Sequence, residues 1–456
     1  MLYVYININI MINCKLIILP TTLFDYKYVK NVIKKYSIKE IIIWEHPYYF
    51  TRLNFNKKKL ILHRASMKYY QNTLPNTLLN LVDKVTYLDF NKQLTINNSV
   101  AFDPVDEIDC PIIKKTKLLE SPGFLLTTNQ LKLYREKTIN NKRIIFGNFY
   151  KFNKKLLNII PDIKSQDKHN RKKLPKSTII KDFPKLNNEN SLIVINAIKY
   201  INKHFRKNVG DVRNFNYPIN KQQANLVLKH FLKNYFDNFG NYQDYTKKDN
   251  GILFHTILSS SINIGLITPK QIIDKLPNKP LNSYEGLIRQ YFWREYQRYC
   301  YIYRNHWIKN DFFKNKKSIN DKYYLGTTNC PPVDDAIKDA FSTGYLHHIR
   351  RLMIMANYMN LDGIKPYDAK RWFMEFAIDS YEWVMYQNVL DMGFFISGGM
   401  TMRKPYITSS NYIIQNSDYS KGEWSIKWDN MYKEFLTKHK KKLYPFRYHF
   451  PFLRTI

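Results

Sequence analysis

The sequence reads GYLHHIRRLM at residues 344–353, KRWFMEFAIDSYEW at 370–383, GGMTMRKPY at 398–406 and SSNYIIQNSDY at 409–419. Aromatic and polar residues are mixed in these stretches, within segments whose spacing is otherwise helical. Long helical patterns with wide apolar faces dominate from Asn220 onward. They predict an all-helical domain over residues 221–456.

The amino-terminal part has a different pattern. Short apolar runs alternate with segments of helical period, and the runs are KLIILP at 15–20, EIIIWE at 40–45, KLILHRA at 59–65 and KVTYLDF at 84–90. Interpreted as strands, they predict a parallel α/β sheet with crossover helices in a domain of residues 1–125. We expect residues 1–12 to be an extension upstream of the true domain, because Met11 lies just before the first strand.

Residues 126–220 are basic and irregular, most of all in KSQDKHNRKKLPKS at 164–177. This composition favours an interdomain connector, although a solvated loop is the better explanation for any single lysine in it. The formal net charge of the 456 residues is +35, which would attract a polyanion such as nucleic acid. The alternative is compositional, because Lys, Asn, Ile and Tyr are all abundant in chains from AT-rich genomes.

The cysteines and the apolar runs argue against a disulfide-rich protein and against a membrane protein. Cys14, Cys110, Cys300 and Cys330 are too few and too scattered for a disulfide framework, and no pair has metal-ligand spacing. The first twenty residues are apolar, but three asparagines interrupt them and they lack a basic start. We therefore expect a cytoplasmic or nuclear protein without signal peptide or membrane span.

Several motifs resemble those of one family. EHPYYF at 45–50, FGNYQDY at 239–245 and YFWREYQRY at 291–299, with the four stretches quoted first, resemble the photolyase/cryptochrome superfamily. Within it, the chain resembles the bacterial-type iron–sulfur branch, the deoxyribodipyrimidine photolyase-related proteins. The resemblance implies an α/β antenna-type domain, a connector and an all-α domain that binds FAD.

The resemblance also implies light-dependent DNA repair, in which FAD passes an electron to a flipped pyrimidine lesion. The expected lesion is the (6-4) photoproduct, because HHIRRLM resembles the string in photolyases that act on it. A cryptochrome-like blue-light photoreceptor and a photolyase for cyclobutane pyrimidine dimers remain alternatives. UV-damaged DNA is the expected partner, and we expect a monomer without an obligate protein partner.

The cofactor site is carried by FHTILS at 254–259 and the residues that follow. Small hydroxyl side chains beside a helix start can donate hydrogen bonds to a pyrophosphate, although a serine triplet alone is more often a helix cap. Arg351 and Asp379 match an ion pair beside the flavin, for which the alternative is a surface pair on two helices. The residues expected to bind FAD are His255, Ser259, Ser260, Asn263, Arg294, Arg351, Asp379, Met385 and Asn388.

His348 matches the family's catalytic histidine, which moves a proton while a hydroxyl transfers between bases. Histidine suits this task because its pKa lies near the operating pH, whereas a lone histidine is more often structural. On a helix, His347 and His348 would point about 100° apart, so His347 is expected to assist or to pack. Tyr406 completes the expected catalytic set, and the expected DNA or lesion contacts are Gln290, Trp293, Tyr412 and Arg171.

Trp372 matches an aromatic residue that carries electrons to the flavin in this branch, and Tyr324 stands where the relatives have a second Trp. The chain departs from its relatives at Phe373, where they have Tyr, and at Met385, where a polar residue faces flavin N5. Phe cannot lose a proton on oxidation, and Met makes no strong hydrogen bond. These departures affect electron hopping and flavin protonation.

The iron–sulfur ligands are the clearest departure, because a four-iron cluster needs four thiolates. Cys330 matches one ligand, but DYSKGEWSIKWDNMYKEFL at 418–436 holds no Cys, and Ser420 stands at one ligand position. We predict no cluster and no other metal ligand, with Trp424 and Trp428 among the residues that hold this region by packing. The family's antenna domain can hold 6,7-dimethyl-8-ribityllumazine, and the resemblance extends that option to this chain.

Overall fold

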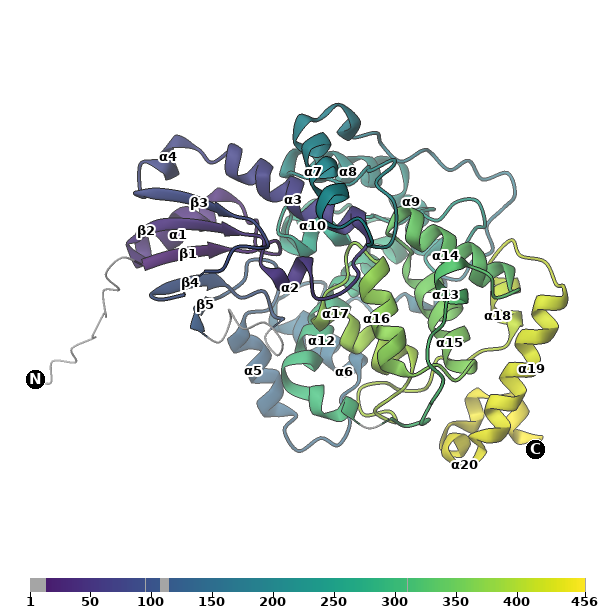
Figure 1. Cartoon of the computed structure of the whole chain (residues 1–456). Coiled ribbons are helices and arrows are strands. Elements are labelled where there is room, and N and C mark those ends of the chain that lie inside the picture. Colours follow the sequence, from purple (N-terminus) through teal and green to yellow (C-terminus); the bar gives the residue numbers. More distant parts are fainter. Residues whose placement is uncertain (1–13, 95, 107–114, 310, 456) are drawn as a thin grey trace, which may run out of the picture.

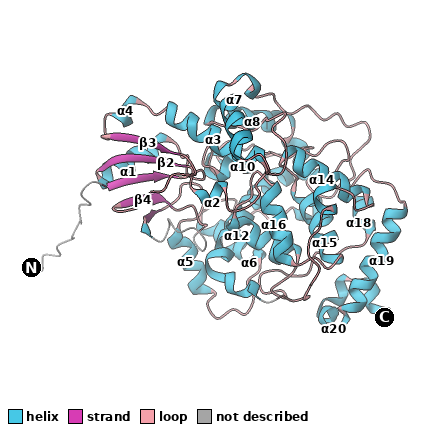
Figure 2. Cartoon of the chain, in the orientation of Figure 1, coloured by secondary structure: helices cyan, strands magenta, loops and turns pink. Residues whose placement is uncertain are grey.

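The computed structural model describes residues 14–94, 96–106, 115–309 and 311–455. A small sheet lies at one end of the molecule and a larger body of helices at the other (Figure 1). Figure 2 shows that the strands are confined to the end that holds the sheet. The expected upstream extension and Cys110 lie outside the described residues. The predicted fold class, an α/β domain followed by a helical domain, is confirmed.

The sheet has five parallel strands in the order β3-β2-β1-β4-β5. Their bounds are β1 Cys14–Ile18, β2 Ile38–Trp44, β3 Lys84–Leu88, β4 Ser99–Phe102 and β5 Lys117–Leu119. The prediction of a parallel sheet is therefore confirmed. The strands β4 and β5 were not predicted, because runs of four and three residues carry too little periodicity to be recognised.

One predicted strand is wrong, because KLILHRA at 59–65 lies within the helix α3, Lys57–Asn72. The Asn56 side chain caps this helix by accepting a hydrogen bond from the Lys58 N–H at 2.9 Å. The helix is buried on most of its surface, from Lys58 to Tyr70. A helix buried all round reads as a continuous apolar run, which periodicity alone cannot distinguish from a buried strand.

The stretch that the sequence presents as irregular contains three helices, α5 Thr128–Lys137, α6 Phe146–Leu156 and α7 Leu192–His204. Helix α6 packs against the long helix α12, Leu281–Arg304, and α7 packs against α3. These helices thus belong to the packed body. The domain boundaries at 125 and 220 stay a prediction.

The other α-helical elements of the described residues are joined by loops and short 3-10 turns, and two further segments are π-helices, a form that is frequent at functional sites. The further elements are α1 Tyr26–Tyr36, α2 Pro47–Phe50, α4 Asn76–Leu79, α8 Lys221–Asn234, α9 Phe236–Tyr242, α10 Ser259–Asn263, α11 Pro269–Ile273, α13 Lys322–Leu325, α14 Pro331–Thr343, the π-helix Arg350–Ala356, α15 Asn357–Leu361, α16 Pro366–Phe376, α17 Glu382–Met385, the π-helix Tyr386–Gly393, α18 Ser410–Gln415, α19 Glu423–Lys438 and α20 Lys440–Leu443. Among the described helices, none has the length and apolar character that crossing a bilayer requires.

Polar contacts join the α/β domain to the helical body. Arg52 donates to Glu382 at 3.0 Å, and the Trp383 N–H donates to Asp106 at 3.1 Å, so α17 is held against the α/β domain. The backbone N–H of Leu125 donates to Glu295 on α12 at 2.9 Å. These contacts position α12 and α17, which both contribute to the site described below.

Close packing of α9 against α12 gives a test of the fold. A Cβ at Gly240 would lie 2.4 Å from backbone atoms of Asn282 and Ser283, so we expect Gly240→Ala to lower the free energy of unfolding by about 2 kcal/mol. In α6, a Cβ at Gly147 meets nothing within 4 Å, and Gly147→Ala should raise the free energy by up to about 1 kcal/mol. Denaturant unfolding of both variants measures the difference. Equal stabilities would contradict the packing described.

Candidate active site

Two adjoining cavities lie in the helical body. The larger has a volume of about 1190 Å³ and the smaller about 250 Å³. They share six lining residues, namely Gln290, Trp293, Gln297, His348, Arg351 and Asn388. Because these six come from α12 and from both π-helical regions, segments that are far apart in sequence meet at one site.

Most of the predicted site residues converge on these cavities. Besides the shared residues, the larger cavity is lined by Arg171, Met385, Tyr406 and Tyr412, and the smaller by His255, Ser259, Asn263, Arg294 and Asp379. Ser260, His347, Trp372 and Tyr324 are not among the lining residues. The geometry brings the predicted set together, and the roles of its members stay predictions.

Asp379 is the centre of a hydrogen-bond network at the smaller cavity. Its carboxylate accepts a hydrogen bond from one arm of the Arg351 guanidinium at 3.1 Å, and the other arm lies 2.9 Å from the second carboxylate oxygen as an ion pair. The Ser259 hydroxyl donates to the same carboxylate at 2.6 Å, and the Asn263 amide donates to the Asp379 carbonyl at 2.9 Å. Asp379 is buried, so the alternative of a surface ion pair is wrong.

The serine triplet does not cap a helix. It forms the first turn of α10, whose N-cap is Leu258, and the Ser259 hydroxyl is bound to Asp379. The hydroxyl oxygens of Ser260 and Ser261 are buried without a hydrogen-bond partner. Unpaired buried hydroxyls are costly, so two donors beside the smaller cavity fit a bound group rich in acceptor oxygens, as a pyrophosphate is.

Arg294 connects this network to the α/β side of the molecule. Its guanidinium donates to the Asn263 side chain at 3.1 Å and to the Gly123 carbonyl at 2.6 Å. It also lies over the rings of Phe124 and Trp383, 4.2 and 4.9 Å from their centroids. Burial lowers the pKa of Arg294 to about 10. A charged group held this firmly can position a neighbouring anion.

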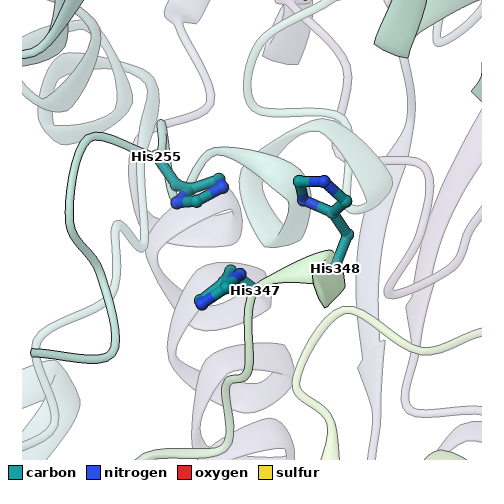
Figure 3. A group of neighbouring side chains, drawn as sticks. All are labelled: His255, His347 and His348. Carbon is teal, nitrogen blue, oxygen red and sulfur yellow. The ribbon is translucent and has the colours of Figure 1, made fainter. Parts of the chain in front are cut away.

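Three histidines gather beside the network (Figure 3). The rings of His255 and His347 are stacked, with centroids 4.6 Å apart and planes at 15°. Burial lowers the pKa of His255 to about 4 and that of His347 well below its usual value, so both rings are neutral at pH 7. The His348 side chain is 41% exposed, which leaves it as the histidine that can meet a substrate.

The expected arrangement of the histidine pair is corrected in one respect. His347 lies in the loop before the helix, and His348 is the first helical residue. The helical angle of about 100° therefore does not describe them. Their rings are 6.1 Å apart at 70°, and His347 donates to or accepts from the Thr246 hydroxyl at 3.2 Å.

Sequence reasoning missed two residues of the site. Asp244 lies 3.4 Å from the ring of His348 and 2.9 Å from the guanidinium of Arg171. Although burial opposes the charge, the His348 hydrogen bond and the arginines hold the pKa of Asp244 below its usual value. The ring of Phe146 stacks on Trp293, with centroids 3.9 Å apart. Asp244 lies within FGNYQDY, whereas nothing in the sequence singled out Phe146.

Comparisons with known proteins agree with this architecture. Residues 16–217 match the family model "Deoxyribodipyrimidine photo-lyase-related protein". A (6-4) photolyase of Agrobacterium fabrum (strain C58 / ATCC 33970) is 33% identical over 265 residues, which are 54% of this chain and 52% of that protein. The chain thus spans about half of that relative's length.

An uncharacterized protein of Acanthamoeba polyphaga mimivirus is 52% identical over 85 residues, which are 18% of this chain and 69% of that protein. The crystal structure of a class III photolyase from Agrobacterium tumefaciens matches with a TM-score of 0.55 and 13% identity, over 93% of this chain and 86% of that one. Residues 16–217 of this chain are thus similar to the deoxyribodipyrimidine photolyase-related family, and the chain as a whole has the fold of a photolyase. Members of the photolyase/cryptochrome family bind FAD.

In this photolyase-related chain, ring contacts lead from the cavity wall to the surface. Phe373 lines the larger cavity and contacts Trp372, with centroids 5.1 Å apart. Phe341 contacts Trp372 at 5.7 Å and stacks on Tyr324 at 5.6 Å. The Tyr324 hydroxyl donates to Glu375 at 2.8 Å. The two predicted electron carriers are therefore linked through one phenylalanine.

The region of the iron–sulfur ligands is packed by aromatic residues. Trp424 and Trp428 are buried, and the Trp428 indole donates to the Thr408 carbonyl at 3.0 Å. Cys330 is buried at the start of α14, where burial raises the pKa of its thiol to about 12, and Ser420 is exposed. The absence of a cluster stays a prediction, which iron and acid-labile sulfide analysis of anaerobically purified protein tests.

The buried ion pair gives a prediction for stability. We expect Asp379→Asn to lower the free energy of unfolding by about 3 kcal/mol, because it leaves the partly buried guanidinium of Arg351 beside a neutral amide. The matched control is Asp274→Asn in the exposed Lys270–Asp274 pair, which should change stability by less than about 0.5 kcal/mol. Denaturant unfolding compares them. Similar losses in both variants would show that the Asp379 network does not hold the site.

Proposed function

We propose that the protein repairs UV-damaged DNA in a light-dependent reaction, with the (6-4) photoproduct as its substrate. The observation that carries the proposal is the position of His348, half-exposed at the wall shared by both cavities and close to Trp293 and Arg351. A proton-moving group, a stacking surface and a cation thus line one space. This is the set that repair of a flipped base needs.

FAD is the proposed cofactor. When bound, it absorbs light and supplies the electron that opens the lesion. The unpaired hydroxyls of Ser260 and Ser261, next in sequence to the lining residue Ser259, would donate to its pyrophosphate, and Arg294 in the wall of the smaller cavity would contribute positive charge. The Arg351–Asp379 pair and Asn388 would hold the redox-active end, with Met385 in the wall of the larger cavity.

DNA would bind at the larger cavity. Its lining includes Lys154, Lys164, Arg171, Arg403 and Lys404, so the site is basic as the net charge of +35 suggests. Phosphate contacts of this kind give binding that is independent of sequence and weakened by salt. The stacked Phe146–Trp293 pair offers a flat apolar surface to the flipped lesion, and Tyr406 and Tyr412 lie in the same cavity.

His348 would donate the proton that repair of a (6-4) lesion requires. Asp244 supports this role, because its carboxylate lies 3.4 Å from the ring of His348 and can orient it. When the bound cofactor has to be reduced, Trp372 would pass an electron toward the cavity and recover one from Tyr324, which an external reductant such as a thiol would reduce in turn. The Tyr324 hydroxyl would at the same time give its proton to Glu375, which it contacts at 2.8 Å.

A blue-light photoreceptor is the second candidate. It is favoured by Met385 and Phe373, which place a thioether and a phenyl ring in the cavity wall where polar groups would assist proton transfer. Activity on cyclobutane dimers is the remaining alternative for the substrate. The proposal of a DNA-repair enzyme also includes a lumazine antenna in the α/β domain, a monomeric state and a cytoplasmic or nuclear location.

The proposal predicts different effects at His348 and Trp293. His348→Ala should lower the rate of (6-4) repair at least about 100-fold while FAD content and affinity for damaged DNA stay near wild type. Trp293→Ala should first weaken binding of damaged DNA, by about 1–3 kcal/mol, because it removes the stacking surface. Repair of lesion-bearing oligonucleotides under blue light and fluorescence binding assays measure both effects.

The control is His306→Ala, an exposed histidine that is not among the lining residues of either cavity. It should repair and bind like the wild type. Wild-type repair by His348→Ala would show that the proton comes from another group. A wild type that binds FAD but repairs neither lesion under light would favour the photoreceptor.

A further inference from the structure

We propose that His255, His347 and His348 bind one divalent transition-metal ion of the Zn²⁺ class at the wall of the smaller cavity. One ring nitrogen of each histidine lies within 4.8 Å of a ring nitrogen of the other two. Figure 3 shows the three rings arranged around a common space. This revises the prediction from sequence that the chain holds no metal ligand.

Zinc binds imidazole nitrogen at about 2.0–2.1 Å, so the nitrogens of a tetrahedral site lie about 3.4 Å apart. Nitrogens up to 4.8 Å apart would therefore have to close by up to about 1.4 Å. His348 can supply this movement, because its side chain is 41% exposed and it begins its helix. His255 and His347 are buried and stacked with their planes at 15°, and because the lone pair of an imidazole lies in the ring plane, one of these rings has to turn before both face the same ion.

Two buried nitrogens lack a suitable partner within the protein. Nδ1 of His347 is buried without any hydrogen-bond partner. His255 has its Nδ1 3.0 Å from the Ile252 carbonyl and its Nε2 3.2 Å from the Gln243 carbonyl. A neutral imidazole has only one N–H, so one of these nitrogens directs a lone pair at a carbonyl oxygen. A cation removes the conflict, because the nitrogen without a proton gives its lone pair to the metal while the other nitrogen donates its N–H to a carbonyl.

The charges around the site permit a divalent cation. Burial keeps His255 and His347 in the neutral form that binds metals. The three nearby arginines are each paired with a carboxylate, Arg171 with Asp244, Arg350 with Asp339 and Arg351 with Asp379. Asp244 faces His348, and Thr246 contacts His347, as outer partners that orient metal-binding imidazoles commonly do.

The donor set selects the class of metal. Three imidazoles favour Zn²⁺, Co²⁺, Ni²⁺ and Cu²⁺ over Mg²⁺ and Ca²⁺, which require oxygen ligands. If the proposed repair function holds, an ion here has one consequence for it. The ion occupies the lone pair of His348 that would otherwise carry the transferred proton, so bound metal inhibits repair.

The test uses the full chain without a histidine tag, loaded with FAD and kept in the dark without DNA. After treatment with a chelator, the protein is titrated with Zn²⁺ in competition with a chromophoric chelator, and bound metal is counted by elemental analysis. We expect one tight Zn²⁺ per chain. His348→Gln and His255→Gln should each weaken binding at least about tenfold. Co²⁺ should give a visible absorption band in the wild type that both variants lack.

His306→Gln is the matched control and should bind Zn²⁺ like the wild type. Thermal melts of the chelated proteins show whether a variant remains folded, and His348→Gln is the decisive variant because His348 is the partly exposed member. Wild-type binding no tighter than that of folded His348→Gln overturns the proposal. Repair that fails both with Zn²⁺ and with chelator counts against the proposed function, whereas the binding result decides the metal site.

Discussion

The site depends on the carboxylate of Asp379. It neutralises the partly buried guanidinium of Arg351 and binds the first turn of α10 through Ser259, and the backbone carbonyl of Asp379 accepts from Asn263. Asn263 in turn accepts from Arg294, which reaches the Gly123 carbonyl. A buried charge is costly unless it is paired, so each member of this chain constrains the next. The network thereby fixes three distant segments around one cavity.

The histidines occupy a separate position beside that network. Burial makes two of them neutral, while His348 keeps access to solvent and to Asp244. This part of the cavity wall thus holds one histidine that can carry a proton, His348, and two neutral histidines, His255 and His347, whose lone pairs can bind a metal ion. The same arrangement supports proton donation to a substrate and coordination of a metal ion, and these two uses of His348 exclude each other.

Much of the fold could be predicted from local pattern. The apolar runs at 15–20 and 40–45 give strands and the long aromatic face at 281–307 gives α12, because their periods match a sheet and a helix. Pattern failed at α3, where burial on all sides hides the helical period. Motif resemblance located His348, Arg351 and Asp379. It could not find the contact between Phe146 and Trp293, because that pairing depends on how α6 packs against α12.

The most direct measurement is the light-dependent repair of defined oligonucleotides by the purified wild-type protein. Its absorption spectrum is recorded first, and oligonucleotides with a (6-4) photoproduct or a cyclobutane dimer are then incubated with it in the dark and under blue light. Chromatography of the digested DNA quantifies each lesion. The account predicts flavin absorption and loss of the (6-4) photoproduct only under light. A flavin-bound protein that leaves the (6-4) photoproduct intact under light would contradict it.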